Sequence, residues 1–224
     1  MTGKLNKKGT SLFDMYIEGK IVDLTERIEE GMPFYPSDPR PELIQFKTLD
    51  IDGYNVKQIV IGTHSGTHVD APIHALKNGI GIDKMDPMAC SGEAEVLDVS
   101  YEREVKPDLL TKDLRGKVVL FYTGSNDEWK PGWSMSSFSY LGVETAKRLV
   151  SIGPRAIGID SPSVEGPYTG RDVHTALLTN GIPIVENISG SLKALLGKDF
   201  YFLCLFLSIK DGDGSPARAM AFLR

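Results

Sequence analysis

The sequence of 224 residues lacks the features of several protein classes. Its longest apolar run has eight residues, Phe200–Leu207, whereas a membrane-spanning helix needs about 20. Lys and Arg number 25 against 30 Asp and Glu, so the chain has no basic excess with which to bind phosphates. Neither a membrane nor a nucleic acid is therefore an expected partner.

Cysteine is also scarce. Only Cys90 and Cys204 are present, and the first eight residues are not followed by the apolar segment of a secretory signal peptide. Two cysteines far apart in a chain without a secretion signal are expected to be buried free thiols. We therefore expect a cytoplasmic protein.

The composition is that of an ordinary globular protein, with 41% apolar and 25% charged residues. No repeat or linker divides the chain, so we predict a poorly ordered leader at 1–19 and a single domain at 20–224. Strands are predicted at Lys20–Leu24, Glu42–Leu49, Tyr54–Gly62, Ala94–Val99, Lys117–Thr123, Arg155–Asp160, Pro183–Glu186, Phe200–Ile209 and Arg218–Phe222. Helices are predicted at Pro107–Leu114, Glu144–Ser151, Asp172–Asn180 and Ser191–Leu196. Alternation of strands and helices after residue 117 predicts an α/β fold, strand-rich, with a mixed sheet.

Histidine is rare but clustered. Of the four histidines, three fall within eleven residues, in the segment His64-Ser-Gly-Thr-His68-Val-Asp70-Ala-Pro-Ile-His74. The glycine and proline in this segment argue against a helix and favour a strand end that runs into a turn. On an extended segment His68 and Asp70 point to the same side, and Gly66 allows the backbone to fold so that His64 joins them.

Two imidazoles and one carboxylate form a ligand set that suits Zn²⁺, Mn²⁺ or Fe²⁺ and leaves a coordination position open, which is typical of a catalytic site. The alternative is that these histidines only pack in the core or lie on the surface. In the second half of the chain, His174 lies on a predicted helix and Glu186 ends an apolar strand. A buried Glu needs a partner, and a cation is one, but neither residue indicates a site by itself.

The chain resembles the cyclase or arylformamidase family of metal-dependent hydrolases, which includes bacterial kynurenine formamidase and isatin hydrolase. The motif His-x-Gly-Thr-His-x-Asp-x-Pro-x-His is met at every fixed position between His64 and His74. Less specific matches lie at Asp23–Asp38, at Gly158–Ser163, at His174 with Glu186, and at Asp213–Arg218.

The resemblance implies a swivelling β/β/α domain that assembles as a homodimer or homotetramer and holds one or two divalent metals, Zn or Mn. It implies that His64, His68 and Asp70 bind the first metal and that Asp70, His174 and Glu186 bind a second. It assigns His74 as the catalytic residue and not as a ligand. With a reference pKa near 6.5, His74 suits general acid/base catalysis of amide cleavage.

The resemblance also bears on the substrate. The resemblance favours an arylformamidase that hydrolyses N-formylkynurenine in tryptophan catabolism. The alternatives are hydrolysis of a cyclic amide such as isatin, a cyclase or dehydratase reaction on the same site, and a non-catalytic metal-binding protein. Four aromatic residues are candidates for the wall of a substrate pocket, namely Phe34, Tyr35, Trp129 and Trp133.

Overall fold

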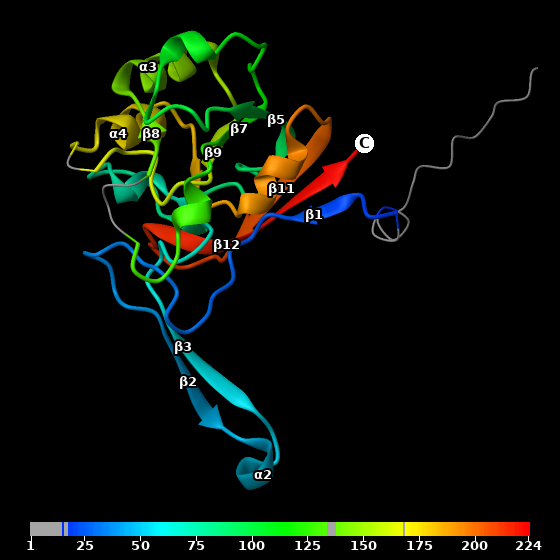
Figure 1. Cartoon of the computed structure of the whole chain (residues 1–224). Helices are drawn as coiled ribbons and strands as arrows, with labels where there is room; N and C mark the ends of the chain where they lie inside the picture. The colour runs from blue at the N-terminus through cyan, green and yellow to red at the C-terminus, as the bar shows by residue number, and fades with distance from the viewer. Residues whose placement is uncertain (1–14, 16–17, 134–137, 168) are drawn as a thin grey trace, which may run out of the picture.

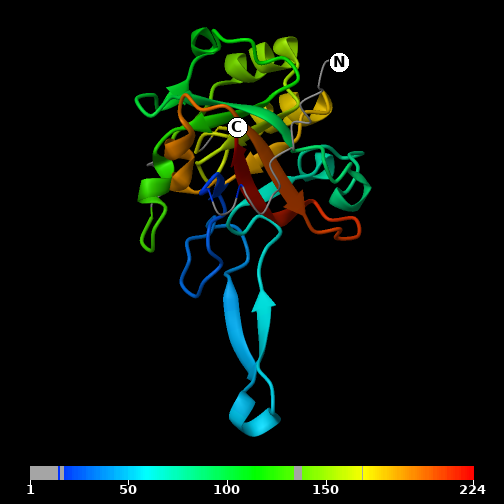
Figure 2. The ribbon, with the colours of Figure 1, turned by 90° about the vertical axis from the view of Figure 1, so that its right-hand side faces the viewer.

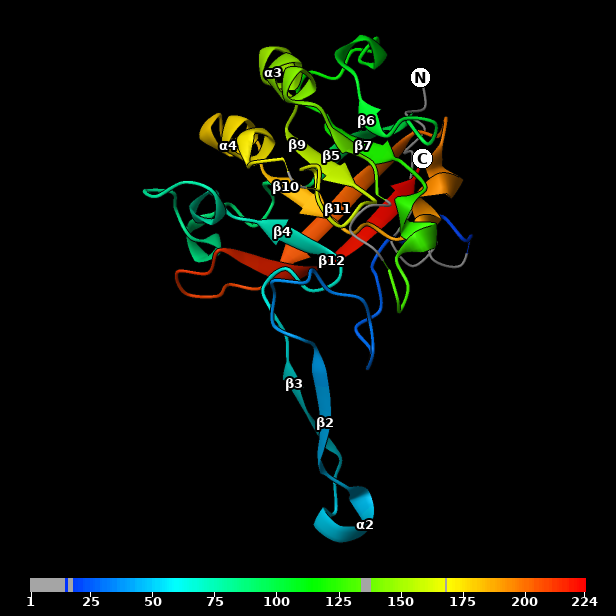
Figure 3. The ribbon, with the colours of Figure 1, turned by 60° about the vertical axis from the view of Figure 1, so that its left-hand side comes forward.

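The computed structural model of the chain describes residue 15 and residues 18–133, 138–167 and 169–224. Most of the predicted leader, 1–19, lies outside the described residues. In the described part, eight strands form one sheet in the order β1-β12-β11-β5-β7-β9-β10-β4, and β12 also pairs with β4. This extra pairing closes seven of the strands into a barrel (Figure 3). The strands are β1 (Ile21–Asp23), β4 (His68–Asp70), β5 (Gly92–Asp98), β7 (Val118–Tyr122), β9 (Ala156–Ile159), β10 (Ile184–Glu186), β11 (Phe200–Phe206) and β12 (Gly214–Leu223).

The sheet is mixed, as predicted. Strands β5, β7, β9 and β10 run parallel to their neighbours within this group, whereas the other pairings are antiparallel. Together with few helices, this confirms the strand-rich α/β fold class. Alternation along β7 separates two cores, because Val118 and Leu120 face one side of the sheet while Val119 and Phe121 face the other.

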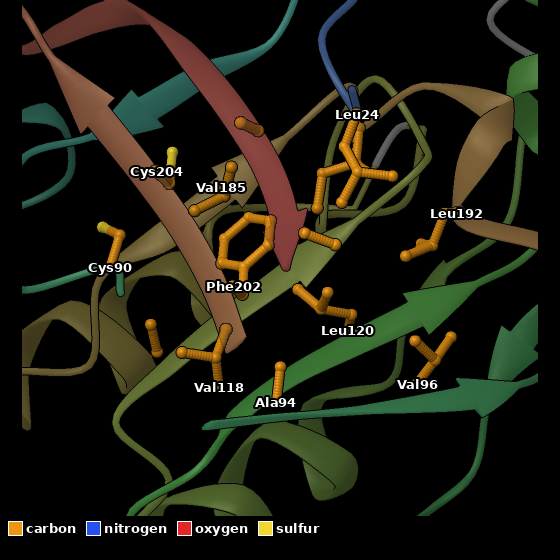
Figure 4. Packing of buried hydrophobic residues seen from close by; sticks show 14 of the residues in the cluster. Leu24, Cys90, Ala94, Val96, Val118, Leu120, Val185, Leu192, Phe202 and Cys204 are labelled. Carbon is orange, nitrogen blue, oxygen red and sulfur yellow. The ribbon is translucent and has the colours of Figure 1, made fainter. Parts of the chain in front are cut away.

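The first core fills the interior of the barrel. In Figure 4, Phe202 and Cys204 on β11 and Leu120 on β7 lie in the space between the strands, and Val185 approaches from β10. Cys90 and Cys204 are both buried free thiols, as expected from the sequence. The interior is therefore a packed apolar core that holds the strands in register.

The second core lies between the outer face of the sheet and two helices, α3 (Val143–Ile152) and α4 (Asp172–Thr179) (Figures 1 and 3). Helix α3 ends at Gly153, which adopts a left-handed conformation with φ of 74°. None of the described helices is long and apolar enough to cross a membrane.

A two-stranded arm projects from the body of the molecule (Figures 1 and 2). It consists of β2 (Glu42–Lys47), the short helix α2 (Leu49–Asp52) at its tip and β3 (Val56–Val60). A further small parallel pair is formed by β6 (Glu104–Val105) and β8 (Tyr140–Leu141). The arm connects the segment before residue 42 with the histidine motif that begins at His64.

Each of the nine predicted strands overlaps an observed one, but two of the predicted helices are 3-10 helices, and the first of these is much shorter than predicted. Pro107–Leu114 contains only a 3-10 turn at Pro107–Leu109, because the backbone leaves the helical region at Leu110, where ψ is 64°. Ser191–Leu196 is a 3-10 helix at Gly190–Leu195. The short strands β6 and β8 were not predicted, whereas β4 lies in the histidine segment that was expected to be a strand end followed by a turn.

Candidate metal centre

The short strand β4 presents His68 and Asp70 on one side, as their spacing predicts. It lies between β10 and β12, and its register places Glu186 of β10 directly opposite His68. The side chains of His68, Asp70 and Glu186 are all at least nine-tenths buried. Pairing of a strand from the first half of the chain with one from the second half therefore assembles this part of the site.

Two further histidines reach the same point from other elements. Gly66, with φ of 64°, turns the backbone so that His64 approaches Asp70, with 2.9 Å between Nδ1 and the carboxylate. Helix α4 carries His174 in its first turn. The site is thus built by a loop, two strands and one helix.

The five residues converge around the carboxylate of Asp70. Its oxygens lie 2.9 Å from His64 Nδ1, 3.4 Å from His68 Nε2 and 3.5 Å from His174 Nε2. Glu186 completes the group, with oxygens 3.4 Å from His68 Nε2 and 3.3 Å from His174 Nε2. The side chains that the sequence singles out as ligands therefore meet within one small volume, and Asp70 occupies its centre.

The charges in this group stabilise one another. Burial opposes the charged imidazole of His68, but the carboxylates of Asp70 and Glu186, each 3.4 Å from its Nε2, outweigh burial and raise its pKa to about 10. Burial would raise the pKa of Asp70, yet the imidazoles of His174, His64 and His68 around it hold that pKa well below its ordinary value. The same balance raises the pKa of His174 and lowers that of Glu186.

The donors present fit a divalent cation. His68 Nε2 and Asp70 Oδ2 are buried side-chain atoms that find no hydrogen-bond partner among the described residues, and both face the centre of the group. One atom each from His64, His68 and Asp70 can be chosen so that all lie within 4.8 Å of one another. Nitrogen and carboxylate donors without thiolate suit zinc or manganese.

His74 lies beside this group, on the 3-10 turn Pro72–His74. Its ring centroid is 4.2 Å from that of His64 and 5.5 Å from that of His174, and about a third of its side chain is exposed. Burial lowers its pKa, so the imidazole is neutral and able to accept a proton at neutral pH. One ring nitrogen of His74 also lies within 4.8 Å of donor atoms of Asp70 and His174, close enough for the three residues to share one ion, so the position of His74 fits both a base and a ligand.

A cavity of about 290 Å³ opens above the centre and is lined by His64, His68, His74, His174 and Glu186. Of the four aromatic candidates, Tyr35 and Trp129 line this cavity, whereas Phe34 and Trp133 do not. The ring of Trp133 contacts Trp129 edge-on at 4.4 Å between centroids and so supports it from outside the cavity.

Two acidic residues at the site were not among the predicted site residues. Glu165 contacts His174 Nδ1 at 3.1 Å, and Asp213 contacts His64 Nε2 at 3.3 Å. Asp213 lies in one of the segments that carry the family resemblance, but nothing in its sequence neighbourhood pointed to a contact with His64. Glu165 has no recognisable sequence signal.

Comparisons with known proteins agree with this site. Residues 22–166 match the sequence model of the family described as "Putative cyclase", so the chain belongs to the cyclase family. It is 33% identical to the kynurenine formamidase of Geobacillus thermodenitrificans over 88% of this chain and 95% of that protein.

Solved structures are also similar. A structure described as a potential metal-dependent hydrolase with cyclase activity has a TM-score of 0.79 and 26% identity, and the match covers 92% of this chain and 98% of the other. Isatin hydrolase A from Ralstonia solanacearum has a TM-score of 0.84 over the full length of both chains. Its identity is 19%, so this second likeness concerns the fold alone.

Proposed function

We propose that the protein is a metal-dependent hydrolase of carbon–nitrogen amide bonds and that its substrate is N-formylkynurenine. The observation that supports the reaction class is the convergence of His64, His68, Asp70, His174 and Glu186 beneath an open cavity that His74 also lines. The 33% identical kynurenine formamidase supports the substrate.

The chain's own residues divide the chemistry between them. A divalent cation bound at the centre lowers the pKa of water and polarises a carbonyl oxygen. His74, neutral and beside the centre, accepts a proton from the attacking water and returns it to the leaving nitrogen. Formate and the free amine are the products, so atoms balance without any other reactant.

The cavity wall suits an aromatic amino acid that carries a formamide. Tyr35 and Trp129 supply faces for an aniline ring. Arg171 is the only lysine or arginine among the described residues that line the cavity, and a guanidinium complements the carboxylate of an amino acid. Isatin carries no such carboxylate, so this arrangement favours N-formylkynurenine over the cyclic amide.

We expect removal of metal with a chelator to abolish hydrolysis of N-formylkynurenine and addition of Zn²⁺ or Mn²⁺ to restore it. Mass spectrometry before and after the metal is added back measures the metal content. This content should rise to one or two ions per chain as the activity returns. Isatin serves as the comparison substrate under the same conditions. Full activity after complete metal removal would contradict the proposal, and metal uptake without turnover of any amide would favour a non-catalytic metal-binding protein.

We further propose a cytoplasmic location, which two buried unpaired thiols support because reducing compartments keep thiols free.

We also propose that the protein is a homo-oligomer in which the β2–β3 arm packs against a second copy. Among the described residues, half of the sixteen large hydrophobic residues that are exposed lie on the arm: Ile44, Phe46, Leu49, Ile51, Tyr54, Val56, Ile59 and Val60. A two-stranded hairpin is marginally stable alone, and an exposed apolar patch of this kind is typical of an interface.

The double substitution Phe46→Glu with Ile51→Glu is expected to weaken this association by about a hundredfold or more, because buried aromatic and aliphatic anchors dominate interfaces. The two side chains are 62% and 87% exposed in the single chain, so their replacement should leave the fold intact. Mass by light scattering during size-exclusion chromatography measures the change. Tyr101→Glu, which is 69% exposed but off the arm, is the matched control. An unaltered oligomer in the double variant would overturn the assignment of the arm.

A further inference from the structure

An imidazole binds a metal ion through one nitrogen only when the proton is on the other nitrogen, so a partner at that second nitrogen decides whether the ring is a competent ligand. We propose that Glu165 and Asp213 are positioning residues that hold the rings of His174 and His64 in the tautomers required for metal binding. The inference rests on the proposed metal-dependent function and adds two residues that act through the ligands.

Glu165 contacts the nitrogen of the His174 ring that faces away from the centre of the group. Its carboxylate lies 3.1 Å from Nδ1 of the ring, while Nε2 faces Asp70 and Glu186 at the centre. The backbone amides of Val173 and His174 donate to the same carboxylate at 3.1 Å and 3.2 Å. Because the carboxylate accepts from both backbone and ring, it fixes the position of the first turn of α4 and the orientation of the imidazole at once.

Asp213 holds His64 in the corresponding way. One carboxylate oxygen lies 3.3 Å from Nε2 of the ring, whereas Nδ1 faces Asp70 at the centre. The other oxygen accepts a hydrogen bond from the hydroxyl of Thr63 at 2.8 Å, which orients the carboxylate. The same carboxylate lies 3.9 Å from Nδ1 of His74.

His68 shows that the arrangement is common to all three rings. Its Nδ1 lies 2.8 Å from the backbone carbonyl oxygen of Gly66, and its Nε2 faces the centre. Each of the three imidazoles therefore has an acceptor at the outer nitrogen and directs the inner nitrogen toward Asp70. For His68 the backbone provides the acceptor, so only His64 and His174 depend on side chains that can be substituted.

The test compares Glu165→Gln and Asp213→Asn with the wild-type protein. Each variant keeps the shape of the side chain but removes one acceptor oxygen, and the new amide group can donate to the ring and favour the wrong tautomer. We expect titration of the metal-free protein with Zn²⁺ in a competing chelator to show affinity weakened by about 10- to 100-fold. Glu165→Gln should affect the ion held by His174, and Asp213→Asn the ion held by His64.

Glu165 also caps α4, so weakened binding could follow from a loosened helix alone. Thr175→Gly changes an exposed position in the middle of α4, where the hydroxyl bonds to the backbone carbonyl of Arg171 and not to His174. Glycine is a poorer helix former than threonine, so this variant weakens the helix and should keep wild-type Zn²⁺ affinity. A second readout is the nitrogen-15 spectrum of the imidazoles in Zn²⁺-saturated protein. It should show the proton on Nδ1 of His174 in the wild type, with this signal changed in Glu165→Gln.

The outcomes separate the inference from the function on which it rests. A wild-type protein that binds no divalent ion overturns both. A wild type that binds Zn²⁺ and variants that bind it equally well overturn the positioning role alone. If Thr175→Gly lowers affinity as much as Glu165→Gln, Glu165 acts only as a helix cap. If Asp213→Asn abolishes one site completely, Asp213 is itself a ligand and not a positioning residue.

Discussion

Replacing His74 with asparagine is expected to lower kcat by about 10²- to 10⁴-fold while metal content stays at the wild-type level. The substitution removes the group that accepts and returns the proton but leaves the donors around Asp70 in place. The lowered pKa of His74 means that the wild-type imidazole is neutral, and therefore ready to act as a base, over most of the neutral range. The measurement pairs steady-state kinetics with mass-spectrometric metal analysis of the same sample.

The two roles open to His74 give opposite results in that experiment. If His74→Asn loses metal together with activity, His74 is a ligand, as its proximity to Asp70 and His174 allows. If the variant retains both, the ring is not catalytic and another group must move the proton. His74→Ala is a useful second variant, because it leaves no amide that could take the place of the imidazole.

The centre of the site could be predicted from the sequence because its residues are close along the chain. A period of two places His68 and Asp70 on one side of a strand, and a glycine that tolerates positive φ allows His64 to turn back toward them. The approach of His174 and Glu186 required a family pattern, since it depends on the pairing of β10 with β4. Strand pairing between distant segments leaves no local signal in a single sequence.

The positioning carboxylates and the arm show why other features could not be predicted. Glu165 reaches His174 from a loop nine residues earlier, and Asp213 reaches His64 across 149 positions. Nothing in the composition around either residue distinguishes it from a surface acid. The two strands of the arm were predicted. Local β-propensity does not indicate whether such a strand pair packs against the body of the molecule or projects from it.

Asp70→Asn is expected to remove all tightly bound metal and to lower activity below that of the His74 variants, because the two ligand groups that the family resemblance implies would share this carboxylate. Asp70 is fully buried, and its oxygens face three imidazoles. An amide offers one acceptor oxygen in place of two and places donors toward a centre that needs acceptors. Mass-spectrometric metal content and turnover of N-formylkynurenine measure the result. Asp211→Asn, on an exposed pair with Lys84, is the control that should change neither.

Asp70→Asn is also expected to lower the free energy of unfolding of the metal-free protein, by an amount that depends on pH. Because the folded-state pKa of His68 is raised to about 10, its contribution to the free energy of unfolding is fully present below pH 6.5 and is lost as pH rises toward 10. The depressed pKa of Asp70 makes its own contribution present above pH 4 and lost in acid. Removing Asp70 leaves buried charges without their partner, which costs about 3–5 kcal/mol. The free energies of unfolding of metal-free wild type and Asp70→Asn, measured in urea, should therefore differ most near pH 6 and converge toward pH 10. A difference that does not change with pH would show that Asp70 does not hold these histidines in their charged form.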